Sequence, residues 1–277
     1  MSATRTFALA GAIATFATAA FAADLRLPPP PPPQPVATVD TGWYLRGYLG
    51  MSNQFFNGLD HPTFLNAPLF GWYDKGGFDS SPFGGVGIGY TANNWLRFDV
   101  TGEYRGKAGF HALDHYDDGA GNTLTNNYTA SKSEWVGLVN AYIDLGTWWS
   151  ITPYVGAGVG VASIRIDHFR DLNLIAGGGG YAPSGTKTNF AWALHAGASY
   201  KVTSNFALDF SYRYLNLGSG ESGLLQNFDP LASGAQPPFY PVTFNRIQSH
   251  DLMLSVRWML QAEQPAPVYA PPLIRKG

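Results

Sequence analysis

Charged side chains recur at alternate positions in five short segments of this 277-residue chain. There are five of each sign, and they are Arg46, Arg97, Asp99, Glu103, Arg105, Asp144, Asp209, Arg213, Asp251 and Arg257. Charges that are shielded from bulk water are costly unless they pair with one another. The equal numbers therefore predict a charge network in a closed interior, whose chemistry is ion pairing and hydrogen bonding.

Four residues close together in the sequence have side chains that can bind a metal or act in catalysis. They are His111, His115, Asp117 and Asp118, and both residue types ligate metal ions such as zinc. We expect them instead in a solvated, flexible loop. The sequence thus predicts no metal ion, no cofactor and no catalytic residue, and we expect a protein that is not an enzyme.

Two glycine-rich stretches resemble phosphate-binding loops only superficially. Glycine occupies every second position from 85 to 89 and again from 156 to 160, and no helix is expected after either stretch. A period of two belongs to a strand. We expect these glycines to leave space for Arg and Tyr side chains of neighbouring strands.

The elements that would position the charges are eight segments in which apolar and polar residues alternate. They span residues 41–52, 82–92, 95–106, 133–146, 151–166, 189–202, 206–217 and 247–260. In the third segment, Leu96 and Phe98 face one way, and Arg97 and Asp99 face the other. The sequence predicts an all-β fold.

Short and long connections between the eight segments alternate strictly. The connections after the second, fourth and sixth segments are tight, and the other four run to roughly 20 to 30 residues. Long loops are expected on the outside of an antiparallel barrel that crosses an outer membrane, with short turns on the periplasmic side. We therefore predict an eight-stranded antiparallel up-and-down transmembrane β-barrel over residues 41–260, with long extracellular loops and short periplasmic turns.

The polarity of the two strand faces separates a membrane barrel from a soluble one. Leu, Val, Phe, Ile and Ala fill one face, with aromatic residues near the strand ends as in the girdles of a lipid interface. These aromatic residues are Trp43, Trp95, Trp135, Trp148, Trp149, Tyr200 and Trp258. A soluble eight-stranded barrel is the alternative, and it would need an apolar ligand or a packed apolar interior, whereas the opposite face carries ten charges and many glycines.

The two ends of the chain differ in composition from the predicted barrel. Residues 1–22 combine Arg5 with an alanine-rich apolar run and end in Ala20-Phe21-Ala22, a pattern typical of a secretory signal peptide. Residues 23–40 contain a run of six prolines, which favours a semi-rigid polyproline II spacer. Residues 261–277 form a second proline-rich segment, and both segments are expected on the periplasmic side.

The overall composition excludes several classes of protein. The chain has no Cys, so an exported protein of this sequence does not depend on disulfides. Charged residues make up only 13% of the chain and the formal net charge is −2, so there is no basic field to attract nucleic acid.

Several motifs together resemble those of a known family. They are "GWYLRGYLG", "NAYIDLG", "TPYVGAGVGVA" and "FALDFSYRYLNLG", together with a mature start at "AD", and they cover residues 20–260. The chain resembles the outer-membrane β-barrel, or porin-family, surface proteins of alphaproteobacteria, related in design to the transmembrane domain of outer membrane protein A. Barrels of this family usually end on an aromatic residue that the barrel-assembly machinery reads, whereas a tail follows Trp258 here.

The resemblance implies partners and an attachment site in the Gram-negative cell envelope. In some members, the N-terminal Ala of the mature chain is linked to peptidoglycan through its α-amine, and Ala23-Asp24 match that pattern. The implied partners are outer-membrane lipid and lipopolysaccharide, peptidoglycan and the barrel-assembly machinery.

Three functions remain open from the sequence. The first is a surface protein that contributes to envelope integrity, tethered to peptidoglycan through Ala23. The second is a small porin for the diffusion of small solutes, although wide channels occur in barrels of about 16 strands. The third is an adhesin or ligand-binding barrel that acts through its loops.

Overall fold

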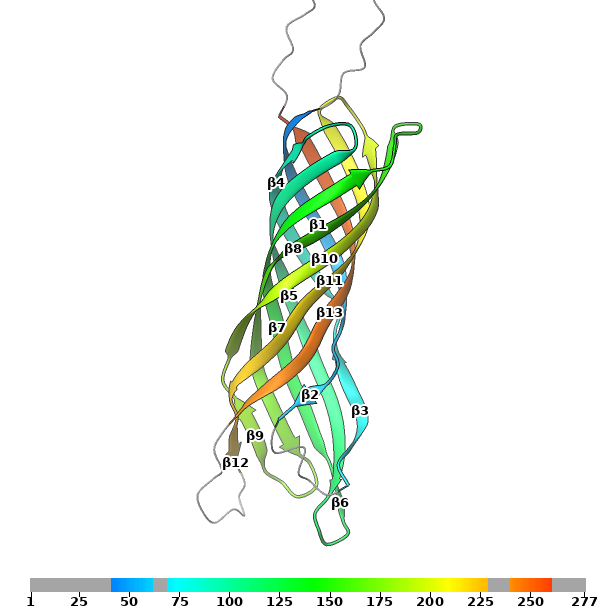
Figure 1. Cartoon of the computed structure of the whole chain (residues 1–277). Helices are drawn as coiled ribbons and strands as arrows, with labels where there is room; N and C mark the ends of the chain where they lie inside the picture. Colours follow the sequence, from blue (N-terminus) through cyan, green and yellow to red (C-terminus); the bar gives the residue numbers. More distant parts are fainter. Residues whose placement is uncertain (1–40, 62–68, 229–239, 261–277) are drawn as a thin grey trace, which may run out of the picture. The chain divides into compact units, whose positions relative to one another are not determined.

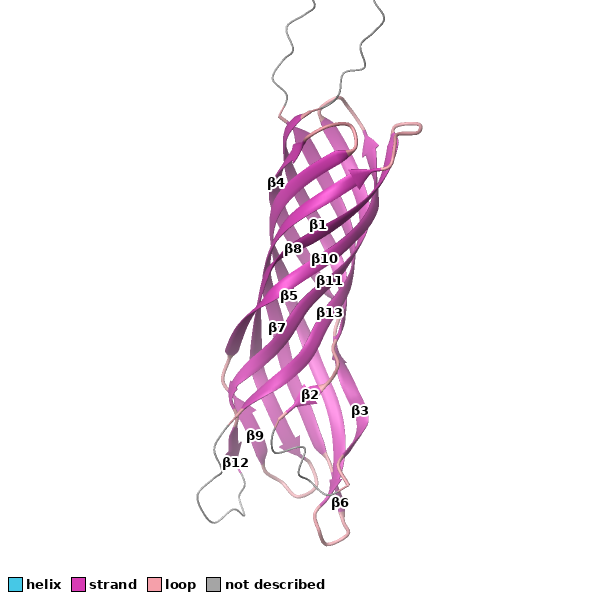
Figure 2. Cartoon of the chain, viewed as in Figure 1, coloured by secondary structure: helices cyan, strands magenta, loops and turns pink. Residues whose placement is uncertain are grey.

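The computed structural model describes residues 41–61, 69–228 and 240–260, and the elements in these ranges are strands, with no helix (Figures 1 and 2). Eight long strands are β1 (Gly42–Phe55), β4 (Ser81–Thr91), β5 (Leu96–Asp117), β7 (Asn126–Asp144), β8 (Ile151–Asn173), β10 (Gly185–Lys201), β11 (Phe206–Leu224) and β13 (Pro241–Met259). Five short strands are β2 (Leu59–Asp60), β3 (Gly71–Phe78), β6 (Thr123–Leu124), β9 (Gly179–Ala182) and β12 (Gln226–Phe228). None of the described ranges holds a helix that is long and apolar enough to cross a membrane.

Each long strand pairs antiparallel with the long strands next to it in the chain, and the last strand pairs with the first. Arg46 on β1 lies opposite Gly87 on β4 and opposite Arg257 on β13. The other long strands follow in chain order from β4 to β13. The eight strands therefore form a closed ring, and the predicted antiparallel up-and-down barrel is confirmed.

The two ends of the ring differ in their connections. One end, called the turn end, holds the short connections 92–95, 145–150 and 202–205, together with Gly42 and Met259. The other end, called the loop end, holds the short strands β2, β3, β6, β9 and β12, and it points downward in Figure 1.

Several strands extend further toward the loop end than the sequence predicted. β5 was expected to end at Gly106 and continues to Asp117, and β8 continues to Asn173. The prediction that His111 and His115 lie in a loop is wrong, because both lie on β5. Along these extensions most apolar residues face inward, as Ala108, Phe110 and Phe169 do, and most polar residues face outward. On β5 the change follows a register shift between Arg105 and Ala108. Asp114 and Asp171 are inward polar exceptions.

The part of the ring next to the turn end has an apolar outer surface and is called the turn half. It comprises residues 42–55, 81–105, 134–163, 190–214 and 250–260. Its outward residues are half-exposed and include Leu45, Leu49, Val86, Val100, Val139, Ile143, Val155, Val159, Leu194, Phe210, Leu252 and Leu254. Such a band suits contact with lipid rather than with water.

Aromatic side chains border this apolar band at both edges. Trp43, Trp95, Trp148, Trp149, Tyr200 and Trp258 are exposed around the turn end. Trp135 was expected near a strand end but lies within β7, because β7 continues to Asn126. It marks the other edge of the band, where its ring lies 4.9 Å from that of Tyr104 on β5.

The rest of the ring, called the loop half, has the opposite polarity. It comprises residues 56–61, 69–80, 106–133, 164–189, 215–228 and 240–249. Its outward residues include Lys107, His111, Thr129, Arg165, His168, Arg170, Thr186 and Thr188. Its interior is an apolar core, called the loop-half core, built from Phe78, Phe110, Tyr128, Ile164, Ile166, Phe169, Leu215, Leu217, Val242, Phe244 and Ile247.

Phe244 lies at the centre of the loop-half core. Its ring centroid lies 5.1 Å from that of Phe110, 5.5 Å from that of Phe78 and 6.3 Å from that of Phe169. Aromatic pairs at such distances are stabilising beyond the area that they bury. The loop half is thus packed in the way of a small soluble barrel.

Three predicted segments lie outside the described residues. They are the signal peptide at 1–22, the proline-rich linker at 23–40 and the proline-rich tail at 261–277. The ring itself runs from Gly42 to Met259, within the predicted barrel at 41–260.

Candidate functional site

The interior of the turn half contains the ten charges that the sequence pattern placed there. Each of the ten takes part in at least one ion pair. They divide into two clusters. The turn-side cluster comprises Arg46, Arg97, Asp99, Asp144, Asp209 and Arg257, and the middle cluster comprises Glu103, Arg105, Arg213 and Asp251 together with Lys132 and Glu134.

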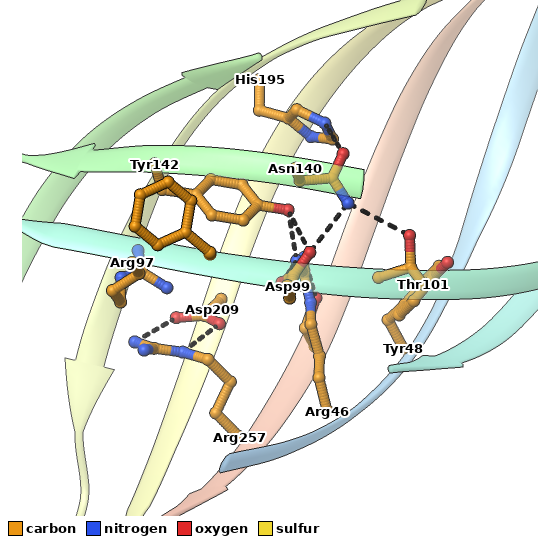
Figure 3. Close-up of polar contacts among 12 residues, drawn as sticks. Arg46, Tyr48, Arg97, Asp99, Thr101, Asn140, Tyr142, His195, Asp209 and Arg257 are labelled. Atoms are coloured by element: carbon orange, nitrogen blue, oxygen red, sulfur yellow. Dashed lines mark hydrogen bonds and ion pairs between the residues drawn. The ribbon is translucent and has the colours of Figure 1, made fainter. Parts of the chain in front are cut away.

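Asp99 on β5 connects three strands in the turn-side cluster (Figure 3). It accepts hydrogen bonds from Arg46 on β1 at 3.1 Å and from the Asn140 amide on β7 at 2.8 Å. Arg46 also donates to the Tyr142 hydroxyl at 2.8 Å. On its far side, the Asn140 amide oxygen lies 3.2 Å from the His195 ring nitrogen on β10. This chain of polar contacts crosses the lumen from β1 to β10.

Two more ion pairs complete the turn-side cluster. Arg257 on β13 donates to Asp209 on β11 at 2.8 Å and to the Ser199 hydroxyl on β10 at 2.6 Å. Arg97 donates to both carboxylate oxygens of Asp144, its neighbour near the turn end, the shortest bond being 2.7 Å. The planar guanidinium suits such two-pronged contacts with a carboxylate.

Glycines of β4 and β8 make room for tyrosine rings in the lumen. A Cβ atom on Gly89 would overlap the ring of Tyr44, and a Cβ on Gly85 would overlap the ring of Tyr48. On β8, a Cβ on Gly156 would overlap the ring of Tyr142. The glycines thus face the lumen, and the hydroxyl groups of the tyrosine rings that cover them bond to charged residues of the clusters.

The middle cluster is organised around two arginines. Arg213 donates to Glu103 at 2.7 Å and to Asp251 at 2.7 Å. Arg105 donates to Asp251 at 2.9 Å and lies 2.7 Å from a carboxylate oxygen of Glu134. That last contact is close enough for an ion pair, although the N–H does not point along it.

Lys132 and Glu134 belong to this network, and the sequence analysis missed them. They form an ion pair with each other on β7 and are buried. The signal was present, because continuing the inward register of Tyr142 and Asn140 along β7 reaches positions 134 and 132. The outward apolar residues of β7 stop at Trp135, so the apolar pattern gives no sign of the inward charges beyond it.

Each cluster is electrically neutral by itself. The turn-side cluster has three arginines and three aspartates, and the middle cluster has three cations and three carboxylates. The Arg105 and Asp251 side chains are fully buried, and the Glu103 side chain is 1% exposed. A water-filled channel would leave such side chains exposed, so water is excluded from the lumen at this level.

The loop half contains a different polar arrangement, a pair of buried carboxylates. Asp114 accepts hydrogen bonds from the Tyr128 hydroxyl at 2.6 Å and from the Asn126 backbone N–H at 2.7 Å. Asp171 is 9% exposed, and one of its carboxylate oxygens has no hydrogen-bond partner. Burial, and next the charge of Asp114, raise the pKa of Asp171 to about 7.

The remaining predicted residues do not form a site in the described part of the chain. Ala23 and Asp24 lie outside it. His111 and His115 are on β5, Asp117 is its last residue, and the described ranges contain no group of three or more His, Cys, Asp or Glu residues that could hold a metal ion.

A closed antiparallel ring with an outer apolar band, aromatic edges and a charged interior defines a transmembrane β-barrel protein. The family model described as the outer membrane protein beta-barrel domain matches residues 8–235, and the chain belongs to this family.

Relatives of the chain come from several bacteria. An uncharacterized protein of Brucella abortus is 31% identical over 236 residues, which cover 75% of this chain and 79% of that protein. Outer membrane protein PagN of Salmonella typhimurium is 41% identical over 83 residues, 29% of this chain and 33% of PagN. A putative adhesin of Rickettsia conorii is 30% identical over 139 residues, 49% of this chain and 53% of the adhesin.

Solved structures with a similar course of the chain have low sequence identity. Neisserial surface protein A is 18% identical with a TM-score of 0.43, and the match covers 79% of this chain and 97% of that one. The outer membrane protein OprG of Pseudomonas aeruginosa is 12% identical with a TM-score of 0.45, covering 80% and 100% of the two chains.

Proposed function

We propose that this outer-membrane barrel is a closed, non-enzymatic display protein that contributes to envelope integrity and contacts its surroundings through the loop half. The observation that carries the proposal is the burial of the middle cluster, in which Arg105 and Asp251 are fully buried. The loop-half core fills the interior next to it, on the side of the loop end. A lumen filled in this way supports a rigid scaffold and argues against a diffusion pore.

The proposal includes an orientation, with the turn end in the periplasm and the loop end outside the cell. Short turns on the periplasmic side and longer elements on the outer side are the rule for such barrels. The polar outer surface of the loop half supports this orientation, because it suits a part of the barrel that stands in water beyond the lipid. The names of two relatives, PagN and the putative adhesin, are consistent with a surface role.

Planar-bilayer recordings of the refolded full chain test the closed lumen. We expect no stable conductance steps from the parent protein. A variant in which Glu103, Arg105, Arg213 and Asp251 are all replaced by alanine keeps the charges balanced and should show small steps, because it removes the side chains that fill the middle of the lumen. Stable, ion-selective steps from the parent would contradict the proposal and favour the porin alternative.

A second candidate function is a covalent tether to peptidoglycan through Ala23. It is supported by the sequence alone, in which the predicted cleavage after Ala22 leaves Ala23-Asp24 ahead of six prolines. Mass spectrometry of peptides that muramidase releases from detergent-boiled sacculi tests it. A muropeptide joined to Ala23 is expected, and free Ala23 recovered only in the outer-membrane fraction would contradict the tether. An Ala23→Gln variant with unchanged cleavage is the control, and it should lose the adduct.

A further inference from the structure

We propose that the outward face of β8 in the loop half, with the groove beside it, binds the phosphorylated saccharide head group of a glycolipid in the outer leaflet of the same membrane. The residues that carry the proposal are Arg165, His168 and Arg170. It rests on the orientation proposed above, in which the loop half emerges from the outer leaflet.

The first argument is the level of Arg165 relative to the apolar band. Along the outward face of β8, the apolar residues Val159 and Val161 are followed by Ser163 and then by Arg165. Ser163 is paired in register with Trp135, which marks the edge of the band. Arg165 therefore lies two residues, about 7 Å along the strand, beyond the aromatic edge. Lipid head groups lie at this level.

The second argument is the polar surface around Arg165. Its register neighbours are Ser133 on β7, which is buried, and Thr186 on β10, which is exposed. The side chain is 55% exposed, and its Nε–H donates to Asp167 at 2.9 Å. In the described part of the chain, its terminal nitrogens donate to no other group. An exposed arginine whose terminal nitrogens are free, next to the exposed hydroxyl of Thr186, suits a phosphate.

The third argument is a bulge that adds a further basic side chain to the same face. Thr129 pairs with Arg170 and Ser131 pairs with Asp167, so β8 has one residue more than β7 at this point. His168 takes the extra position with a φ of 55°, in the left-handed region that few residues other than glycine adopt. Bulges commonly re-aim a side chain, and His168 and Arg170 are both exposed here.

The fourth argument is a groove next to these side chains. A hollow of about 290 Å³ is lined by His168, Arg170, Leu172, Tyr181 and Phe228, among others. Tyr181 and Phe228 are exposed aromatic residues on β9 and β12. Exposed aromatic faces suit the C–H faces of sugar rings, and the two basic residues suit their phosphates. Arg165, His168 and Arg170 thus form a row that leads from the edge of the lipid to the groove, along which a head group could lie.

The test is native mass spectrometry of the purified full chain in detergent, with bis-phosphorylated lipid A as the probe. We expect the parent to retain the lipid, and a triple variant with Arg165→Gln, His168→Gln and Arg170→Gln to bind it at least tenfold more weakly. The matched control is Lys107→Gln, His111→Gln and Arg246→Gln, which removes the same charges from exposed positions on β5 and β13 and should bind within twofold of the parent.

Three results would overturn the proposal. One is unchanged binding by the β8 triple variant, and another is equal binding of dephosphorylated lipid A by the parent. The third is displacement of lipid A by inorganic phosphate at equal concentration, which would assign the site to a soluble phosphate compound. Folding of each variant is checked by its heat-dependent gel mobility, since both triple variants change only exposed residues.

A separate experiment tests the orientation. The chain has no Cys, so an Asn122→Cys variant presents a single thiol at the turn after β5. Labelling of intact cells by a membrane-impermeant maleimide is expected. Absence of labelling would contradict the proposed orientation while leaving the lipid measurement in detergent unaffected, so the two failures are distinguishable.

Discussion

The same eight strands form two halves of opposite polarity. In the turn half, Val139 faces outward and Asn140 faces the lumen, whereas in the loop half of the same strand Thr129 faces outward and Ala130 inward. Side chains alternate with a period of two on β7. On β5, a register shift between Arg105 and Ala108 exchanges the inward and outward faces. The medium outside the ring thus reverses from lipid to water within one strand, and the residues follow it.

The two halves also close their interiors by different means. The turn half uses ion pairs between buried charges, and the loop half uses packed aromatic and aliphatic side chains around Phe244. The charged interior of the turn half is stable only if every charge stays paired, because a lone buried charge is far more costly than a pair. The comparison therefore predicts that the turn half is sensitive to single charge changes, and that the loop half is sensitive to changes in protonation.

The largest effect is expected from breaking the middle cluster with Asp251→Asn. Asp251 accepts hydrogen bonds from both Arg105 and Arg213. Removing its charge leaves one positive charge uncompensated in the lumen and should lower the free energy of unfolding by about 3–5 kcal/mol. Urea titration followed by gel mobility without boiling measures the change.

A neutral double variant sharpens this prediction. Arg213→Met combined with Asp251→Leu removes one charge of each sign and should cost less than Asp251→Asn alone, because the cluster stays balanced. If the double variant is the less stable of the two, individual hydrogen bonds rather than charge balance hold the turn half together.

The next effect is a pH dependence of the loop half that comes from Asp171. Its pKa is raised from an ordinary value near 4 to about 7 in the folded protein. Between these two values the folded state keeps a proton that the unfolded state has lost, so stability falls as pH rises from about 4 to about 7. The total loss is up to about 4 kcal/mol, since one pKa unit corresponds to about 1.4 kcal/mol.

Limited proteolysis of the loop half at pH 5 and at pH 8 measures this dependence. We expect faster cleavage at pH 8, after correction for the activity of the protease. Asp171→Asn should remove the difference and be more stable than the parent at pH 8. Cleavage in the turn half should not differ between the two pH values, because its buried carboxylates, such as Asp251, pair with arginines. A parent protein that is equally resistant to the protease at both pH values would show that the pKa of Asp171 is not raised in the folded protein.

The third prediction compares one charge on the two outer surfaces of β7. Val139 is half-exposed within the apolar band, and a lysine there should lower the free energy of unfolding by about 2–4 kcal/mol. Thr129 faces outward in the loop half, and Thr129→Lys should change stability by less than about 0.5 kcal/mol. Denaturant titration in lipid vesicles measures both variants. Equal effects would place the edge of the lipid elsewhere than at Trp135.

The sequence predicted the turn half well, for a physical reason. Its strands are joined by tight turns at one end, and most of their outward residues are apolar, as with Leu252, Leu254 and Val256 on β13. The lumen positions then follow from the period of two. The loop half was not predicted, because on β5 a register shift between Arg105 and Ala108 turns the face that carries Phe110 from lipid to the interior, and nothing in the local pattern marks it.

The partners of buried groups could be predicted only in part. Equal numbers of charges indicated pairing, but which arginine meets which carboxylate depends on the register of the closed ring. Asp114 and Asp171 are a clearer case, because nothing local in the sequence brings them together. They meet because β5 and β8 both pair with β7, where Tyr128 lies opposite Asp171 and donates to Asp114.

The smallest effect is expected from an ion pair in the loop half, between Lys187 and Glu221. These side chains are 33% and 34% exposed, in contrast to the buried pairs of the middle cluster. Water solvates both groups when the pair is broken, so Glu221→Gln should lower the free energy of unfolding by less than about 1 kcal/mol. The same urea titration measures it, beside Asp251→Asn. Similar losses for the two variants would show that burial does not set the strength of the ion pairs, and that the two halves differ less than their polarity implies.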